Sequence, residues 1–274
     1  MPARSIALAL LSIAAVATKT FANDTTRING PAVENAAESE RRITKVKKTA
    51  NEAIVYPALL EDDADRMLDY MEKFSEKRRG YLMRMYSKSK KYFPKVQGIL
   101  KKYDVPTEFA VLLALESAFN ANAVSRAGAV GYWQIMDDVA KEYGLKIVED
   151  QHLTKTPKKI KPQGNATAHK KRTKAKPAID ERKNFVKATH TAAKYLRARM
   201  KNLNNNYLLV AASYNWGVGN VWQAMAASGK KNPSYWDISH KMPAETRAYV
   251  MNFITLNVIF KNYQQFEKGG LCFR

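Results

Sequence analysis

The segment from residue 108 to 119, EFAVLLALESAF, constrains the fold more than any other part of this sequence. Phe109, Leu112, Leu113 and Glu116 recur at positions i, i+3, i+4 and i+7, which share one face of an α-helix. The predicted helix is apolar nearly all round, and such a helix is buried in a protein core. The last position of this face is therefore a carboxylate that folding takes out of water.

Burial gives such a carboxylate a chemical meaning. Desolvation disfavours the charged form and raises the pKa. A carboxylic acid that stays protonated near neutral pH can donate a proton to a leaving group. The alternative is a structural glutamate, bonded to backbone amides or paired with an arginine, and position alone does not separate the two.

The remainder of the chain is also predicted to be helical. Charged residues alternate with Leu, Met, Tyr and Phe at helical spacing between residues 51 and 102, and Asp104 with Pro106 makes a good helix start. Further helices are predicted over 185–202, over 207–214 and from Pro243 through RAYVMNFITLNVIF. Strand signals are scarce. The sequence therefore predicts a mainly α fold.

The charge balance narrows the choice of partner. The 274 residues include 46 Lys and Arg against 25 Asp and Glu, a net charge of +21. Such a field favours nucleic acid, acidic lipid or a wall polymer that bears carboxylates, although a basic surface without a partner is equally compatible. Residues 154–177, TKTPKKIKPQGNATAHKKRTKAKP, have nine cationic and no acidic residues. We expect a basic insertion there, either a tether for a polyanion or a solvated loop.

The first residues predict export. MPARSIALALLSIAAVATKTFAND combines an arginine, an apolar run shorter than the ~20 residues that span a bilayer, and small residues before a cut after Ala22. We expect a signal peptide over 1–22, a periplasmic or secreted protein, no membrane span after cleavage and no nucleic acid as main partner. An uncleaved anchor is the alternative. The single Cys272 and four dispersed histidines predict no disulfide, no metal and no cofactor.

Three further groups of residues suggest a ligand site. In SRAGAVGYWQIM, Ser125 and Gly131 allow close approach of the backbone to a ligand, and the aromatic pair 132–133 with Gln134 suits a sugar. In AASYNWGVG, Tyr214 and Asn215 end a predicted helix of small residues. In MPAETRAYV, a glutamate lies in a first helical turn, where it also stabilises the helix dipole. Ordinary core packing remains the alternative for each aromatic residue taken singly.

Together these groups resemble the lytic transglycosylases of the soluble-lytic-transglycosylase (SLT) and goose-type lysozyme superfamily. The family's motifs match, in chain order, Glu116-Ser117, then Ser125, Gly131, Gln134 and Met136, then Ser213-Tyr214-Asn215, and finally Glu245, Thr246, Tyr249 and Val250. The resemblance covers roughly 95–263, and Trp133 and PAETRAYV are most similar to the membrane-bound lytic murein transglycosylase D branch. Asp137-Asp138 replaces the family's usual proline, and Ser213 its usual alanine.

The resemblance implies a domain arrangement. A lysozyme-like α-helical catalytic domain would span 95–263 and contain the basic insertion 154–177. A flexible linker over 23–50 and a helical extension over 51–94 would precede it, and a tail over 264–274 would follow.

The resemblance also implies cleavage of the β-1,4 bond between N-acetylmuramic acid and N-acetylglucosamine in peptidoglycan glycan strands. Glu116 would serve as general acid and then as base, closing a 1,6-anhydro ring, where ordinary glycosidases use two carboxylates. The implied substrate-binding residues are Ser125, Gly131, Gln134, Met136, Tyr214 and Asn215, and the supporting residues are Ser117, Glu245 and Tyr249.

Three alternatives stay open. A goose-type hydrolase on the same fold would use water as the nucleophile. A non-enzymatic, basic wall-binding assembly protein would keep Glu116 as a structural residue. A polyanion or nucleic-acid binder driven by residues 154–177 would bind with a steep dependence on salt.

Overall fold

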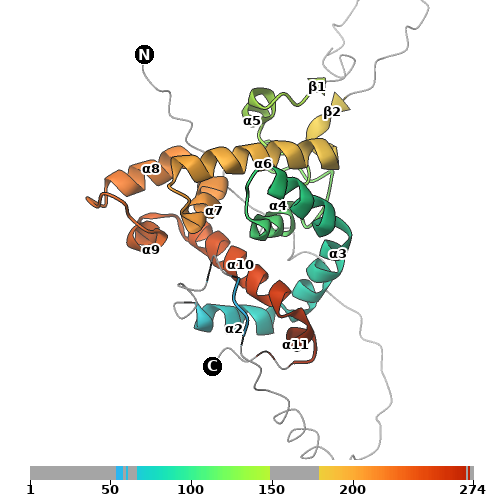
Figure 1. Ribbon diagram of the computed structural model, residues 1–274, viewed down its shortest axis with the longest axis vertical. Coiled ribbons are helices and arrows are strands. Elements are labelled where there is room, and N and C mark those ends of the chain that lie inside the picture. The colour runs from blue at the N-terminus through green and yellow to red at the C-terminus, as the bar shows by residue number, and fades with distance from the viewer. Residues whose placement is uncertain (1–53, 58–59, 61–66, 149–178, 270, 272–274) are drawn as a thin grey trace, which may run out of the picture.

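The computed structural model describes residues 54–57, 60, 67–148, 179–269 and 271 (Figure 1). The predicted signal peptide (1–22), linker (23–50) and basic insertion (154–177) lie outside these residues. Among the helices that are described, none combines the length and the hydrophobicity needed to cross a membrane.

Helices make up most of the described chain, which confirms the mainly α prediction. The α-helices are α2 (Leu68–Lys77), α3 (Arg79–Lys102), α4 (Leu112–Ser117), α5 (Asp137–Glu142), α6 (Phe185–Asn202), α7 (Tyr207–Trp216), α8 (Val218–Ala226), α9 (Tyr235–Ile238), α10 (Ala244–Lys261) and α11 (Tyr263–Glu267). The 3₁₀ turns are η2 (Thr107–Val111), η3 (Glu181–Lys183) and η4 (Ser239–Lys241). Strands β1 (Ile147–Val148) and β2 (Ile179–Asp180) form an antiparallel ribbon, with Ile147 opposite Asp180.

Helix α10 is the centre of the fold. It packs against α7 and α4 on the side of α6, and against α2 and α11 at the other end of the molecule (Figure 1). Every residue from Phe253 to Ile259 is buried, because the sequence FITLNVI is apolar on nearly all sides of the helix. Residues at the first turns of α10 therefore have a fixed position relative to α4 and α7.

The N-terminal helices share the core of the rest of the chain. Helix α3 passes without a break through position 95, where the sequence placed the start of the catalytic domain. Its buried residues, Leu82, Met85, Val96, Ile99 and Leu100, belong to the same hydrophobic cluster as Phe109 and Leu112. The division into domains stays a prediction.

The predicted single helix over 108–119 is wrong in its geometry. The chain forms the 3₁₀ turn η2 first and the six-residue helix α4 second, so the spacing of Phe109, Leu112, Leu113 and Glu116 is not that of one continuous α-helix. Burial of all four side chains is nevertheless confirmed. The helix ends because Ala118 and Phe119 adopt left-handed backbone angles, with φ of 49° and 66°. Such angles in residues other than glycine cost ~1–3 kcal/mol and concentrate at functional sites.

Candidate active site

Glu116 lies at the end of α4 with 8% of its surface exposed. The hydroxyl of Tyr249, on α10, donates a hydrogen bond to its Oε1 atom at 2.5 Å. Burial raises the pKa of Glu116 from 4.5 to about 8, and the bond from Tyr249 opposes this rise. Among the described residues, Glu116 has neither an ion pair nor a bond from a backbone amide. The carboxyl group is therefore protonated at neutral pH, the state that a general acid requires.

Two half-buried tyrosines flank this carboxyl group. Burial, followed by the nearby charge of Glu116, holds the pKa of Tyr249 and of Tyr214 well above the ordinary value. Both phenols therefore keep their protons across the physiological range. The hydroxyl of Tyr214, on α7, donates a hydrogen bond to the backbone carbonyl of Trp133 at 2.8 Å. Tyr249 thus acts on Glu116 directly, whereas Tyr214 joins the neighbourhood of Glu116 to the chain around residue 133.

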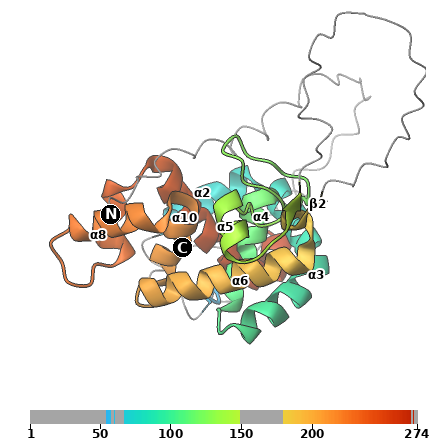
Figure 2. The ribbon, with the colours of Figure 1, turned by 90° about the horizontal axis from the view of Figure 1, so that it is seen from above.

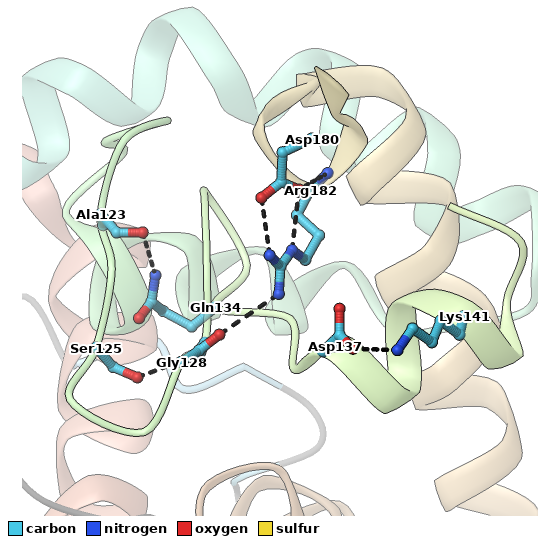
Figure 3. A network of polar contacts seen from close by, with 9 residues as sticks. Ala123, Ser125, Gly128, Gln134, Asp137, Lys141, Asp180 and Arg182 are labelled. Atoms are coloured by element: carbon cyan, nitrogen blue, oxygen red, sulfur yellow. Dashed lines mark hydrogen bonds and ion pairs between the residues drawn. The ribbon is translucent and has the colours of Figure 1, made fainter. Parts of the chain in front are cut away.

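Residues 123–136, which we call the site loop, follow α4 and precede α5. The loop turns at Gly128, Gly131 and Gln134, whose φ angles are 85°, 83° and 46°. The Gln134 amide donates to the carbonyls of Ala123 at 3.1 Å and Gly131 at 2.9 Å, so it closes the loop on itself (Figure 3). The Ser125 hydroxyl accepts a hydrogen bond from the Ala129 backbone at 3.0 Å. Both side chains, which we expected to hold sugars, thus shape the loop.

The site loop is fastened to three helices. The Ser117 hydroxyl, on α4, donates to the carbonyl of Tyr132 at 2.8 Å. The indole N–H of Trp133 donates to Thr189, on α6, at 3.0 Å, and its carbonyl accepts the bond from Tyr214. Trp133 is fully buried, as ordinary core packing predicts, and it is not a stacking platform for a sugar. These bonds fix the backbone of the loop next to Glu116.

Arg182, on η3, supports the same loop from outside, and sequence reasoning missed it. Its side chain is 9% exposed, pairs with Asp180 at 2.8 Å and reaches the carbonyl of Gly128 at 3.4 Å (Figure 3). Its own carbonyl oxygen lies 2.2 Å from the place that a Cβ atom would take at Gly131. The glycine in this motif is thus required by the close approach of protein backbone. An arginine in a short polar segment gives no local signal for such a role.

A small, open pocket lies beside the site loop. Its lining consists of Gln134, Ile135, Met136, Val139, Thr191, Ala192, Tyr195 and Tyr214. The structure thereby brings together three of the six residues expected to bind substrate: Gln134, Met136 and Tyr214. Glu116 is not part of this lining. Tyr214 connects the pocket with Glu116, since it lines the pocket and since the charge of Glu116 contributes to its raised pKa.

The junction of α7 and α10 contains a further pair. The hydroxyl of Thr246 donates to the Oδ1 atom of Asn215 at 2.9 Å, and Thr246 is fully buried. The bond directs the Asn215 carbonyl at α10, and the NH₂ group therefore points elsewhere. Glu245 is exposed in the first turn of α10, where it stabilises the helix dipole. A supporting role for Glu245 stays a prediction.

Two departures from the family motifs have local explanations. Asp137 and Asp138 occupy the first turn of α5, where negative charge is favourable, and Asp137 pairs with Lys141 at 2.5 Å. The hydroxyl of Ser213 is satisfied by the carbonyl of Val210 at 2.8 Å. In the ranges that the structure describes, no three histidine, cysteine, aspartate or glutamate side chains gather so that they could hold a metal ion.

The sequence matches the model of the transglycosylase SLT domain family over residues 96–160 and 160–236, more than half of the chain. The chain belongs to this family. The SLT match is divided at residue 160, inside the predicted basic insertion. The family resemblance inferred from the sequence is thereby confirmed, and the matched residues include the motifs around Glu116 and Tyr214.

Individual relatives agree with this assignment. Membrane-bound lytic murein transglycosylase D of Escherichia coli K12 is 26% identical over 204 residues, which are 74% of this chain and 38% of that protein. The SLT chain described here thus spans well under half the length of this curated relative.

Two solved structures are also similar. An inactive mutant of lytic transglycosylase Slt from Pseudomonas aeruginosa is 19% identical, with a TM-score of 0.44 over 63% of this chain and 24% of its own. The 70 kDa soluble lytic transglycosylase of Escherichia coli is 20% identical, with a TM-score of 0.42 over 61% of this chain and 24% of its own.

Proposed function

We propose that this protein is a lytic transglycosylase that cleaves the β-1,4 bond between N-acetylmuramic acid and N-acetylglucosamine in peptidoglycan. One observation carries the proposal: a single buried carboxyl group, Glu116, whose pKa is raised to about 8 and whose hydrogen bond comes from Tyr249. Membership of the SLT family, and the name of the Escherichia coli relative, support peptidoglycan as substrate.

The proposed reaction needs one proton twice. Protonated Glu116 gives its proton to the glycosidic oxygen as the bond to C1 of the muramic acid breaks. The resulting carboxylate then takes the proton of the sugar's own C6 hydroxyl, and the C6 oxygen attacks C1. A 1,6-anhydro ring forms, no water is consumed, and Glu116 ends in the protonated state in which it began.

Tyr249 suits both halves of this cycle. It keeps its proton, because burial and Glu116 hold its pKa high, and it donates at 2.5 Å to the carboxyl oxygen. A donor at that position stabilises the charge that Glu116 carries between the two proton transfers. The same hydrogen bond lowers the pKa of Glu116, which without it would lie further above neutrality.

The glycan strand would occupy the pocket beside the site loop. Gln134, Met136 and Tyr214 line it, and the Trp133–Tyr214 and Ser117–Tyr132 bonds hold the loop at its edge. Ser125 and Gly131 would act through the shape of the loop, and Asn215 would offer its NH₂ group. A periplasmic or secreted location follows from this substrate and from the predicted signal peptide.

Digestion of purified sacculi tests the proposal. The full chain should release muropeptides with 1,6-anhydro ends, whose mass is one water lower than that of hydrolytic products. Glu116→Gln should abolish release, while Glu76→Gln, an exposed carboxylate on α2, should retain full activity. Release of hydrated ends only would identify a goose-type hydrolase, and equal activity of Glu116→Gln would show that the glutamate is structural.

A further inference from the structure

Helices α3 and α6 carry cationic residues and no acidic residue. Several cations on each helix recur at intervals of three, four or seven residues, which places them in one stripe along the helix. We call the two stripes together the basic face. Its members are Arg84, Lys88, Lys91, Lys95 and Lys102 on α3, and Lys187, Lys194, Arg197 and Lys201 on α6.

Helix α3 packs against α6 (Figure 2). The hydroxyl of Tyr103, which follows α3, lies 3.0 Å from Nδ1 of His190 on α6. Burial, and then the charges of Lys102, Lys194 and Lys95, lower the pKa of His190. Lysines from both helices therefore converge on one place on the surface.

Few acidic groups neutralise the basic face. Asp104, itself 80% exposed, approaches Arg197 at 3.6 Å, and Glu181 pairs with Lys187 at the first turn of α6. Within the described part of the chain, no ion pair involves Lys95, Lys102 or Lys194. Like charges held this close repel each other, so the arrangement opposes stability unless an anionic partner occupies it.

The partner can be identified from the other side of α6. Thr191, Ala192 and Tyr195 line the pocket and alternate along the helix with the residues of the stripe. A helix with its side chains is about 10 Å across. That distance exceeds the Debye length of about 8 Å at physiological salt, so the face acts on groups that reach it and not on the strand inside the pocket. A polymer strand in the pocket lies about one helix diameter from the basic face, a distance that a peptide stem of about three extended residues spans.

We propose that the basic face binds carboxylate groups of peptidoglycan stems outside the pocket, so that the substrate polymer is held at a second surface beside the active site. The proposal rests on the proposed function for its choice of polymer. Lysines predominate on the face, and they act as mobile point charges that suit stems of variable position. Long-range attraction of this kind raises the local concentration of the anionic polymer at the pocket.

A pair of triple variants tests the proposal in the full chain. The face variant carries Lys95→Glu, Lys102→Glu and Lys194→Glu. The control variant carries Lys73→Glu, Lys77→Glu and Lys268→Glu, which are exposed on α2 and after α11, at the far end of the molecule from α6 (Figure 1). Both change the net charge equally. Each also carries Glu116→Gln for the binding assay, so that sacculi are not digested during co-sedimentation.

The face variant should bind sacculi roughly tenfold more weakly than the control variant at 0.15 M salt, and the difference should vanish at 1 M salt. With Glu116 restored, the face variant should digest intact sacculi more slowly, but should cleave glycan strands stripped of their peptide stems at the rate of the parent chain. Equal weakening by both variants would overturn the proposal, and so would unchanged binding of the face variant.

Two results distinguish this proposal from binding to a lipid surface and from the proposed lytic activity. Loss of binding to vesicles of anionic phospholipid, with sacculus binding intact, would assign the face to a lipid surface and overturn the proposal. Selective loss of sacculus binding in a protein that cleaves no glycan would uphold the basic face while the proposed lytic activity failed.

Discussion

The raised pKa of Glu116 makes a prediction about folding as well as about catalysis. The folded protein holds a proton on this carboxyl group up to about pH 8, while the unfolded chain releases it near pH 4.5. Between these values the folded state binds one more proton than the unfolded state, so its stability falls as pH rises. Each pH unit costs ~1.4 kcal/mol, and the whole interval costs about 5 kcal/mol. Domains have total stabilities of only ~5–15 kcal/mol.

Denaturant unfolding of the parent chain and of Glu116→Gln, from pH 5 to pH 9, measures this effect. The difference in unfolding free energy should change in favour of the variant by ~1.4 kcal/mol per pH unit and level off above about pH 8. Taking the difference removes groups that titrate equally in both proteins. Glu76→Gln, which replaces an exposed carboxylate, serves as the matched control. Parallel curves for the parent and Glu116→Gln would refute the buried, protonated carboxyl group and, with it, its proposed role as acid.

Three further predictions follow from the geometry of the site. Tyr249→Phe removes the one hydrogen bond that lowers the pKa of Glu116, so the alkaline limb of the pH–activity profile should move to higher pH and kcat should fall by about tenfold or more; an unmoved profile would contradict the role of this bond. Gly131→Ala should lower the free energy of unfolding by ~3 kcal/mol or more, because the new Cβ would clash with the Arg182 carbonyl. Gly128→Ala has a similar φ but open space around the Cβ, and should cost only ~1–2 kcal/mol in thermal unfolding. Equal losses in the two variants would show that the contact with Arg182 does not matter. Arg182→Ala should cost ~2–4 kcal/mol, because it leaves Asp180 without its partner, and Asp180→Asn should cost less in chemical denaturation; the reverse order would contradict this account.

The sequence predicted helices well where the pattern was long and local. The predicted helix over 185–202 coincides with α6, and α7 extends its prediction by two residues, to Trp216. Burial of Glu116 also followed from its neighbours, because an apolar surrounding does not depend on the exact helix type. The division of 107–117 into η2 and α4 did not follow, since the spacing of apolar residues does not fix whether the backbone hydrogen bonds are of the 3₁₀ or the α type.

The predictions for the site were less complete, for a physical reason. Tyr249 and Glu116 are 133 positions apart, and only the packing of α10 against α4 brings them together. Gln134 has the amide that a sugar site requires, yet it uses that amide for the carbonyls of its own loop. A residue's type shows which bonds it can make, whereas the tertiary structure decides which partners it finds. The motifs predicted a candidate site, and the structure shows most of the hydrogen bonds that its residues make.

The short ribbon of β1 and β2 has a consequence for how this protein can change. Val148 faces Ile179 across the ribbon, so the stretch of sequence between them departs from and returns to neighbouring points on the surface. Because the ribbon holds residues 148 and 179 together, a change in the number of residues between them costs little loop-closure entropy. Grafting a foreign module between 148 and 179 would leave α6 and the Asp180–Arg182 pair in place, which makes this position suitable for giving the protein a new target.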